Sequence, residues 1–389
     1  MFLRQQFLEY ICQTSEIPQG FEISSAQGTY LYDKNNIAYL DFISGFGVNN
    51  IGHGVPEVIK AIQQQSQVYL HSNVYGEHVQ QVQIKLAEKL ADLLPAHLNS
   101  FYFLNSGSEA IDAAIKLSRL ATGRTEIVVC KNAYHGSTLG AESLRSDEMH
   151  RAAFLPLIPG IRFIEFGNIA DLKFITSHTA AVITEVVQAE AGVRRANSEY
   201  WQAMRQQCND HNSLLILDEI QTGLGRTGKL FAFMHYGIIP DLLLSGKALG
   251  AGMPLSAIIA NRTMLAQLFK QLPLAHITTF GGHPVSCAAA LAGLNFLIES
   301  SLIETAEEKG HFFELLLKNN SIQESRREGL FMAIDFQNKI QLMHVLRKLF
   351  EQKVLAEGFL FSPESLRIAP PLCIEDFELK MVAEIINQL

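Results

Sequence analysis

The sequence predicts an α/β protein with a mostly parallel central sheet, and three observations support this fold class. Short apolar runs alternate with helical stretches through the middle of the chain. Several of these runs are apolar at consecutive positions, as strands are when helices cover both faces of a parallel sheet. The helical segments between the runs have the length of crossover connections.

Seven apolar runs are expected to be buried strands of this sheet, because each is short and several are rich in β-branched or aromatic residues. Helical patterns over residues 109–121 and 199–212 fit the connections between them. The expected strands are residues 101–104, 126–130, 162–166, 180–186, 214–218, 241–245 and 256–260.

The two ends of the chain show different patterns. Residues 20–42 predict a hairpin with Lys34, Asn35 and Asn36 at its turn. After about residue 285 come long helical patterns and two more apolar runs, at 330–336 and 366–372. We therefore predict a large domain over residues 45–284 and a smaller α+β domain built from both termini, residues 1–44 and 285–389.

Composition and charge exclude several classes of partner. The 389 residues include 31 Lys and Arg against 39 Asp and Glu, a net charge of −8. This excess of acid disfavours nucleic acid or an anionic membrane as the main partner. The apolar window over residues 242–260 is interrupted by Lys247, three glycines and Pro254, so we do not expect it to span a membrane.

The cysteine and histidine patterns favour a protein of the cytoplasm without a metal. The five cysteines are an odd number and contain no C-x-x-C pair, which disfavours a zinc knuckle or a redox pair and suits a reducing cytosol. No two histidines have the spacing of an H-x-x-x-H ligand pair, and no metal site is predicted.

A candidate phosphate site follows the first expected strand of the sheet. Ser106, Gly107 and Ser108 open a helix there. The free N–H groups of a helix start, together with two hydroxyl groups, attract a phosphate. A plain capping loop, with Ser106 or Ser108 as the N-cap, accounts for the same residues.

Two charged residues stand at the ends of later strands. Asp218 ends the expected strand 214–218, where α/β folds place ligands. A carboxylate buried there needs a cationic partner, such as a protonated ring nitrogen. Lys247 lies among small apolar residues, and burial lowers the pKa of a lysine and makes its amine nucleophilic. A helix-capping Asp218 and a solvent-exposed Lys247 are the structural alternatives.

Two further segments offer cofactor contacts. Tyr134 and His135 follow an expected strand and present an aromatic face. Thr278 and Thr279 belong to a glycine-rich turn that precedes a helix. A packed tyrosine and a simple loop are the structural alternatives.

In this order, the five motifs resemble those of the class III pyridoxal-phosphate aminotransferases of the fold type I superfamily. The resemblance runs from GTYLYD, which begins at Gly28, to LRIAPPL, which ends at Leu372. Its most specific part is residues 217–257. It implies that pyridoxal 5'-phosphate is the cofactor.

The resemblance also implies a role for each candidate residue. Lys247 would be the lysine that forms the Schiff base and moves the proton, and Asp218 would pair with the pyridine nitrogen. Thr279 would reach the phosphate of the neighbouring subunit, so that a homodimer shares its active sites. The remaining cofactor contacts would be Gly107 and Ser108 at the phosphate, Tyr134 and Ile220 on the ring faces, Gln221 near the phenolic oxygen, and Ser106 and His135.

Two segments, one that contains glutamates and one that begins with an arginine, resemble the family's substrate motifs. Residues 185–192 resemble E-P-x-Q-G-E-x-G, and residues 367–371 resemble R-x-A-P-P. In the ω-amino-acid branch, the second glutamate pairs with the arginine and releases it to bind the α-carboxylate of glutamate or 2-oxoglutarate. Glu190 and Arg367 match this pair, and a structural ion pair is the alternative. Glu185, Phe46 and Thr278 are the other expected substrate contacts.

This sequence departs from the family pattern at several positions. Ser137 stands where enzymes for acetylornithine and 4-aminobutyrate usually carry an arginine that binds the donor carboxylate. Phe46 stands where ornithine enzymes have a tyrosine hydroxyl, which weakens the case for ornithine. Val186, Ala189 and His283 replace the usual Pro, Gly and Asn, and we expect these changes to be tolerated.

The resemblance therefore implies transamination between an amino acid or ω-amino donor of the acetylornithine, ornithine or 4-aminobutyrate class and 2-oxoglutarate. The products are an aldehyde or oxo acid and glutamate. A lysine or other ω-amine aminotransferase and a semialdehyde aminomutase are the alternatives within the family.

Two readings outside the family are less favoured. A nicotinamide dehydrogenase needs G-x-G-x-x-G before an acidic residue. The glycines of residues 223–228 instead follow Asp218. A non-catalytic binding protein with this fold is disfavoured because Lys247, Asp218 and Thr279 are all present.

Overall fold

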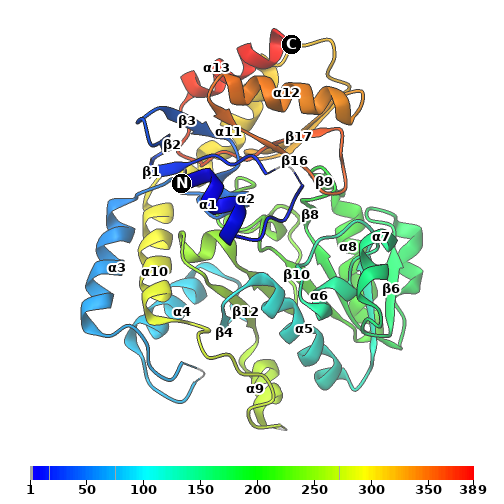
Figure 1. Ribbon diagram of the computed structural model, residues 1–389. Helices are drawn as coiled ribbons and strands as arrows, with labels where there is room; N and C mark the ends of the chain where they lie inside the picture. The colour runs from blue at the N-terminus through cyan, green and yellow to red at the C-terminus, as the bar shows by residue number, and fades with distance from the viewer. Residues whose placement is uncertain (1–2, 17, 75, 271) are drawn as a thin grey trace.

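The computed structural model describes residues 3–16, 18–74, 76–270 and 272–389. At its centre is a seven-stranded sheet with the strand order β4-β12-β11-β10-β7-β5-β6 (Figure 1). Only β12 runs antiparallel to its neighbours in this sheet. The strands are β4 (Ser100–Leu104), β5 (Glu126–Cys130), β6 (Ile161–Ile164), β7 (Thr179–Glu185), β10 (Leu214–Asp218), β11 (Leu242–Ser245) and β12 (Ser256–Ala260).

The predicted fold class is confirmed, and each of the seven apolar runs forms a strand of this sheet. The ends of the strands differ from the predicted ranges by two residues at most. Every residue of β7 and of β11 is buried. Consecutive burial of this kind is the physical reason for the unbroken apolar runs in the sequence.

Helices pack on both faces of the central sheet and alternate residues of one strand point into different cores. Leu215 and Leu217 of β10 belong to the same apolar cluster as Trp201 of α8 (Ser198–His211). Ile216, between them, belongs to a second cluster that contains Ile111 of α5 (Gly107–Thr122). Side chains of a strand alternate between its two faces, so the sheet separates the two clusters.

Segments from the two ends of the chain share one sheet. The N-terminal strands β1 (Ile23–Gln27), β2 (Tyr30–Asp33) and β3 (Ala38–Asp41) continue into β15 (Val354–Leu355) in the order β1-β2-β3-β15. The predicted hairpin turn at residues 34–36 lies between β2 and β3. The prediction for residues 20–42 missed the third strand, β1. Figure 1 shows these strands beside the C-terminal helices.

A second small sheet has the order β13-β14-β17-β16. Its strands are β13 (Glu324–Glu328), β14 (Phe331–Asp335), β16 (Glu357–Gly358) and β17 (Ser365–Ile368), and the adjacent helices are α11 (Leu302–Leu316), α12 (Lys339–Glu351) and α13 (Asp376–Asn387). The pairing of β15 with β3 is consistent with a smaller unit built from both termini. Domain boundaries at residues 44 and 284 remain a prediction.

The other elements connect these units. The helices are α1 (Leu3–Tyr10), α2 (Ser44–Gly47), α3 (Pro56–Val68), α4 (Gln81–Leu93), α6 (Leu139–Ser143), α7 (Glu148–Arg151), α9 (Arg262–Lys270) and α10 (Pro284–Glu299). The 3₁₀ turns are η1 (Ala152–Phe154), η2 (Ile169–Phe174), η3 (Ala232–His235) and η4 (Lys247–Gly250), and a short hairpin joins β8 (Val187–Gln188) to β9 (Arg194–Arg195).

The described residues contain neither a single membrane-spanning helix nor a metal cluster. No single helix in this part of the chain is long and apolar enough to cross a membrane, and α10 and α11 pass that test only as a pair bent by 66°. The same residues contain no group of three or more His, Cys, Asp or Glu side chains placed to hold a metal ion.

Candidate active site

The candidate site lies where the parallel strands of the central sheet end. Glu185 and Asp218 are the last residues of β7 and β10, and Lys247 follows β11 by two residues. The carboxyl ends of such strands are where α/β sheets bind ligands. A cavity of about 190 Å³ opens there, lined by Gly107, Ser108, Tyr134, His135, Gly136, Glu185, Asp218, Ile220, Gln221, Thr222 and Lys247.

Lys247 contributes an amine of unusual acidity. Its Nζ donates a hydrogen bond to Gln221 Oε1 at 2.6 Å. Burial lowers the pKa of this amine to about 8, while the charge of Glu190 raises it and that of Arg367 lowers it further. A lysine with this pKa is partly neutral near pH 7–8, and a neutral amine is the nucleophilic and basic form.

Asp218 is buried and held by two donors. Its Oδ1 accepts a hydrogen bond from the N–H of Ile220 at 3.0 Å, and its Oδ2 accepts one from His135 Nδ1 at 2.7 Å. Burial opposes a charge on His135, but the hydrogen bond and the charge of Asp218, with the charge of Glu185, outweigh it and raise the pKa of the imidazole. The pair therefore fixes a carboxylate at the base of the cavity.

Glu185 fixes the backbone on one side of the cavity. One of its carboxylate oxygens accepts from the N–H of Tyr134 at 3.0 Å, and the other accepts from the N–H of Ala189 at 2.9 Å. Burial raises the pKa of Glu185 to about 7; the charge of His135 opposes this shift and that of Asp218 adds to it. Its visible role is to position the Tyr134 loop.

The start of α5 forms a cradle that only glycine permits. Ser106 is the N-cap, and its Oγ accepts from the N–H of Glu109 at 3.3 Å. A Cβ atom on Gly107 would lie 2.7 Å from Ile220 Cδ1, and one on Gly136 would lie 1.9 Å from Ser108 Oγ. The first N–H groups of a helix have no partner within it, and they attract a phosphate.

These residues fit pyridoxal phosphate. The cradle at Gly107 suits the phosphate, and Asp218 offers the carboxylate that a protonated ring nitrogen requires. Among the described residues, the buried Nε2 atoms of His135 and Gln221 have no hydrogen-bond partner. Buried polar atoms in this condition call for a partner, and a ligand in the cavity would supply one to these two.

The structure brings most of the predicted site residues together but leaves six outside the cavity lining, namely Ser106, Thr278, Thr279, Glu190, Arg367 and Phe46. Ser106 caps α5 instead. Thr278 Oγ1 accepts from Asn105 Nδ2 at 2.6 Å. Thr279 is exposed, and its carbonyl is hydrogen bonded to His71 Nε2 at 2.8 Å. Because Thr279 is expected to serve the neighbouring subunit, its role in a dimer remains a prediction.

Glu190 and Arg367 form a buried ion pair close enough to Lys247 to influence its pKa. Arg367 Nη2 donates to both carboxylate oxygens of Glu190, at 2.7 and 2.6 Å. The Cζ atom of Arg367 lies 4.2 Å from the ring centroid of Phe359 and 5.1 Å from that of Phe46. Its Nη1 is buried and without a partner among the described residues.

The sequence analysis did not identify the loop that carries Thr222, or Glu219, the buried residue that holds this loop in place. Glu219 accepts hydrogen bonds from Thr222 Oγ1 and from the N–H groups of Ala232 and Phe233, at 2.7, 2.8 and 2.6 Å. Burial raises the pKa of Glu219 to about 7. Its position next to Asp218 was the available signal, but its partners come from later in the chain.

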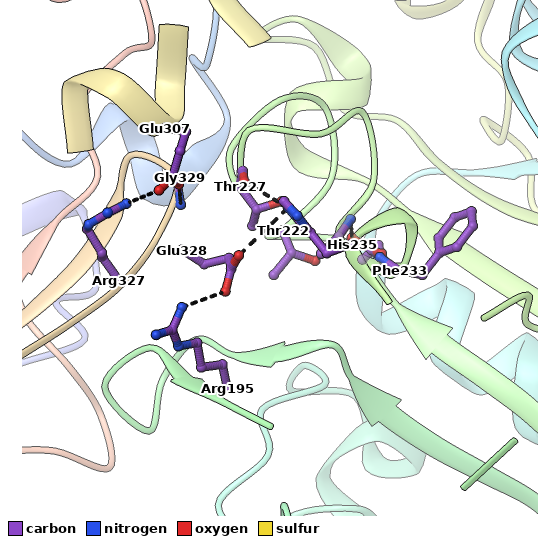
Figure 2. A network of polar contacts seen from close by, with 11 residues as sticks. Arg195, Thr222, Thr227, Phe233, His235, Glu307, Arg327, Glu328 and Gly329 are labelled. Atoms are coloured by element: carbon purple, nitrogen blue, oxygen red, sulfur yellow. Dashed lines mark hydrogen bonds and ion pairs between the residues drawn. The ribbon is translucent and has the colours of Figure 1, made fainter. Parts of the chain in front are cut away.

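The same loop is joined to the second small sheet. His235 Nε2 lies 2.9 Å from the carbonyl oxygen of Thr227 and 3.8 Å from a carboxylate oxygen of Glu328 on β13. Glu328 also pairs with Arg195 at 3.4 Å, and Figure 2 shows the four side chains. The loop beside the cavity is thus tied to β13 by polar contacts.

Comparisons with known proteins cover almost the whole chain. A family model described as class-III aminotransferase matches residues 12–389. The ornithine aminotransferase from Toxoplasma gondii ME49 has a TM-score of 0.92 and 30% identity, covering 100% of this chain and 95% of that chain. Another structure of the T. gondii enzyme contains pyridoxal phosphate at partial occupancy in the active site.

Bacterial enzymes have similar structures. An acetylornithine aminotransferase from Elizabethkingia anophelis has a TM-score of 0.85 and 28% identity. A transaminase from the marine bacterium Virgibacillus has a TM-score of 0.91 and 25% identity. Each alignment covers 99% of this chain and 97% of the other.

Proposed function

Because the chain belongs to the class III aminotransferases, we propose that it transfers an amino group from an ω-amino donor to 2-oxoglutarate. Members of this family are enzymes that depend on pyridoxal phosphate and transfer nitrogenous groups. This membership excludes the nicotinamide dehydrogenase reading. The glycine-rich segment of residues 223–228 follows β10. Its Arg226 is a buried side chain that donates four hydrogen bonds to protein oxygens.

Each residue of the cavity then has a chemical task. Bound pyridoxal phosphate supplies an electron sink for the charge that develops when Cα of the substrate loses its proton. Lys247 accepts and returns that proton, for which its amine must be neutral. Asp218 keeps a proton on the ring nitrogen, and His135 keeps Asp218 in place. The N-terminus of α5 holds the phosphate, with Ser108 beside it.

The observation that carries the choice of acceptor is the pair of Glu190 and Arg367. A buried guanidinium in contact with two aromatic rings is restricted in its motion, and its fork matches a carboxylate. Nη1 of Arg367 has donors in reserve. We infer that Arg367 binds the α-carboxylate of 2-oxoglutarate and glutamate, and that Glu190 occupies Arg367 when the donor is bound.

The proposed donor class rests on the similar structures and on two positions, 137 and 46, at which this sequence departs from the family pattern. Ornithine and acetylornithine aminotransferases are among the similar structures. Ser137 provides no cation for a donor carboxylate, and its Oγ lies 3.1 Å from the hydroxyl of Tyr134. Phe46 provides a ring where a hydroxyl would favour ornithine. Position 137 thus lacks a cation and position 46 lacks a hydroxyl. We therefore infer a donor that presents an ω-amine and whose binding depends little on either side chain.

A panel of donors tests this function. Purified enzyme with pyridoxal phosphate and 2-oxoglutarate is incubated with 4-aminobutyrate, ornithine, acetylornithine, lysine, β-alanine and simple amines, and glutamate is measured. We expect glutamate from at least one ω-amino donor and none from the Lys247→Ala control. Absence of glutamate with every donor contradicts the proposal, and isomerisation of a semialdehyde without 2-oxoglutarate indicates an aminomutase.

We also propose a cytoplasmic homodimer that shares its active sites. Exposed apolar side chains gather near Thr279: Leu70, Ile277 and Phe280 are 60%, 46% and 55% exposed. Close to them lies an open, mostly apolar cavity of about 730 Å³ that includes Phe101 and Phe103. Apolar patches of this kind mark interfaces. Sedimentation of the holoenzyme as a monomer at micromolar concentration contradicts this assembly.

A further inference from the structure

The glycine-rich segment of residues 223–228 has no task in the proposed reaction, yet its arginine is almost completely buried. Arg226 is 1% exposed. Its two Nη atoms donate hydrogen bonds to the carbonyls of Leu330 and Pro370, to Ser44 Oγ and to Asn50 Oδ1, at 3.0, 2.7, 3.2 and 2.6 Å. All four acceptors are neutral oxygens, and a buried charge is costly unless it is hydrogen bonded. Arg226 therefore joins oxygens from both ends of the chain to the loop that carries Thr222.

The glycines of this segment allow Arg226 to reach these partners. Gly225 and Gly228 have φ angles of 88° and 82°, which residues with a Cβ rarely adopt. A Cβ atom on Gly225 would also lie 3.0 Å from Leu372 Cδ1. The glycines thus serve a close packing of the loop against the residues that follow Arg367.

One partner of Arg226 belongs to a turn with an unfavourable backbone. In α2, Ser44 and Phe46 have φ angles of 49° and 59°, and such left-handed residues persist only where surrounding contacts fix them. The Oγ of Ser44 accepts from Arg226 and donates to the carbonyl of Ala369 at 2.7 Å. These two bonds hold α2 in the conformation that places the Phe46 ring centroid 5.1 Å from Cζ of Arg367.

Arg226 also binds the segment that carries Arg367. The carbonyl of Pro370, which it binds at 2.7 Å, lies three residues after Arg367. The carbonyl of Leu330 directly precedes β14, which pairs with β17. One guanidinium is thus bonded to the turn that carries Phe46 and to both strands that hold Arg367 in place.

We propose that Arg226 is a positioning residue for the carboxylate site. It fixes the Phe46 ring and the Arg367 guanidinium relative to each other, and so sets the affinity for the carboxylate of 2-oxoglutarate and glutamate. Its Nη donors are all in use, so it acts through these residues and not on the substrate. This inference rests on the proposed function, because it concerns the same acceptor.

The cofactor side of the same loop has a separate anchor. Glu219 accepts a hydrogen bond from Thr222 Oγ1 at 2.7 Å. Gln221, which lies between these two residues in the chain, accepts from Lys247 Nζ at 2.6 Å. None of these contacts involves Arg226. A change at Arg226 should therefore weaken recognition of the carboxylate more than the chemistry at Lys247.

The test measures each half-reaction of the holoenzyme in single turnovers, as a function of substrate concentration. Arg226→Lys keeps the charge but has no fork to bridge the two pairs of acceptors. It should raise the apparent Kd for 2-oxoglutarate and for glutamate about threefold or more, while the limiting rates and the Kd of the ω-amino donor stay within about twofold. The visible absorbance of the bound cofactor should not change.

A second variant tests the path through α2. Ser44→Ala removes the acceptor of one Nη2 bond and the donor to the carbonyl of Ala369, and it should weaken 2-oxoglutarate in the same direction. In the double variant with Arg226→Lys, the combined loss should be smaller than the product of the two single losses, because both changes break the same hydrogen bond. If Arg226→Lys does not fold, Ser44→Ala alone decides the result.

A matched control comes from another arginine that binds backbone carbonyls. Arg124 Nη1 donates to the carbonyls of Thr179, His211 and Asn212, at 2.9, 2.9 and 3.2 Å. These carbonyls lie at the start of β7 and before β10, at the opposite ends of the strands from the cavity. Arg124→Lys should lower stability and leave the ratio of the two Kd values unchanged.

The outcomes separate this inference from the proposed function. Wild-type enzyme that transfers an amino group to 2-oxoglutarate, combined with an equal rise of both Kd values in Arg226→Lys or no rise in either, overturns the role of Arg226 alone. An unchanged Kd for 2-oxoglutarate in Ser44→Ala does the same. Wild-type enzyme that accepts no amino group onto 2-oxoglutarate overturns the proposed acceptor and this inference with it.

Discussion

Lys247 acquires its chemistry from where β11 ends. Lys247 lies two residues after this strand and lines the cavity, and its backbone adopts a left-handed φ of 46°. Burial disfavours the charged amine, and Arg367 adds a positive charge nearby, while Glu190 opposes both effects. The balance gives an amine that titrates near neutral pH in place of the usual 10.5.

This balance predicts a pH dependence. The rate at which cofactor-free protein takes up pyridoxal phosphate covalently should rise with pH and level off above about pH 8, because the amine is neutral above its pKa and that pKa is about 8. Glu190→Gln removes a charge that raises the pKa, so the rise should move to lower pH. Stopped-flow absorbance in the visible measures both profiles. A midpoint near 10.5 in wild type, or a shift to higher pH in the variant, contradicts the account.

At the scale of the element, the first turn of α5 divides two tasks between two serines. Ser106 Oγ accepts from the N–H of Glu109 and caps the helix. Ser108 lines the cavity, and its Oγ accepts from the N–H of Ser137 at 3.1 Å. The sequence motif offered both hydroxyl groups to a phosphate and left open which of the two serines caps the helix. Only the geometry of the turn separates the cap from the cavity wall.

Substitution of each serine tests this division. Ser106→Ala should lower the free energy of unfolding by about 1 kcal/mol, because an N-cap is lost, and should leave cofactor affinity within about twofold. Ser108→Ala should weaken cofactor affinity severalfold with a smaller effect on stability. Chemical denaturation and titration of the cofactor-free protein measure the two quantities. Equal cofactor affinity in Ser108→Ala and wild type removes Ser108 from the phosphate site.

Elements with a strong local signal were predicted well, and contacts between distant segments were not. The strand 214–218 was predicted exactly as β10, because burial on both faces leaves an unbroken apolar run. The strand β1 was missed; most of its residues are exposed, so it carries no such run. Glu219 was missed, because the backbone N–H groups that it binds belong to Ala232 and Phe233, later in the chain.

At the scale of the whole molecule, the ion pair of Glu190 and Arg367 and the Phe46 ring that contacts it come from three distant parts of the chain. Glu190 follows the central strand β7, Arg367 belongs to β17, and Phe46 comes from the short turn α2 near the N-terminus. The hydroxyl of Ser44 in α2 donates to the carbonyl of Ala369 at 2.7 Å, which ties the turn to the end of β17. Under the proposed function, recognition of the acceptor depends on how both ends of the chain pack on the central sheet.

The central claim is that Arg367 distinguishes the two halves of the reaction, and single-turnover kinetics of each half-reaction tests it most directly. Arg367→Ala should slow the half-reaction with glutamate or 2-oxoglutarate about tenfold to over a hundredfold, because a charge-assisted fork is lost. The half-reaction with the ω-amino donor should slow much less. Glu190→Ala leaves Arg367 free, so α-amino acids should react better as donors and the preference for the ω-amine should narrow. Equal slowing of both halves in Arg367→Ala, or an unchanged donor preference in Glu190→Ala, contradicts the claim and leaves the pair with a structural role.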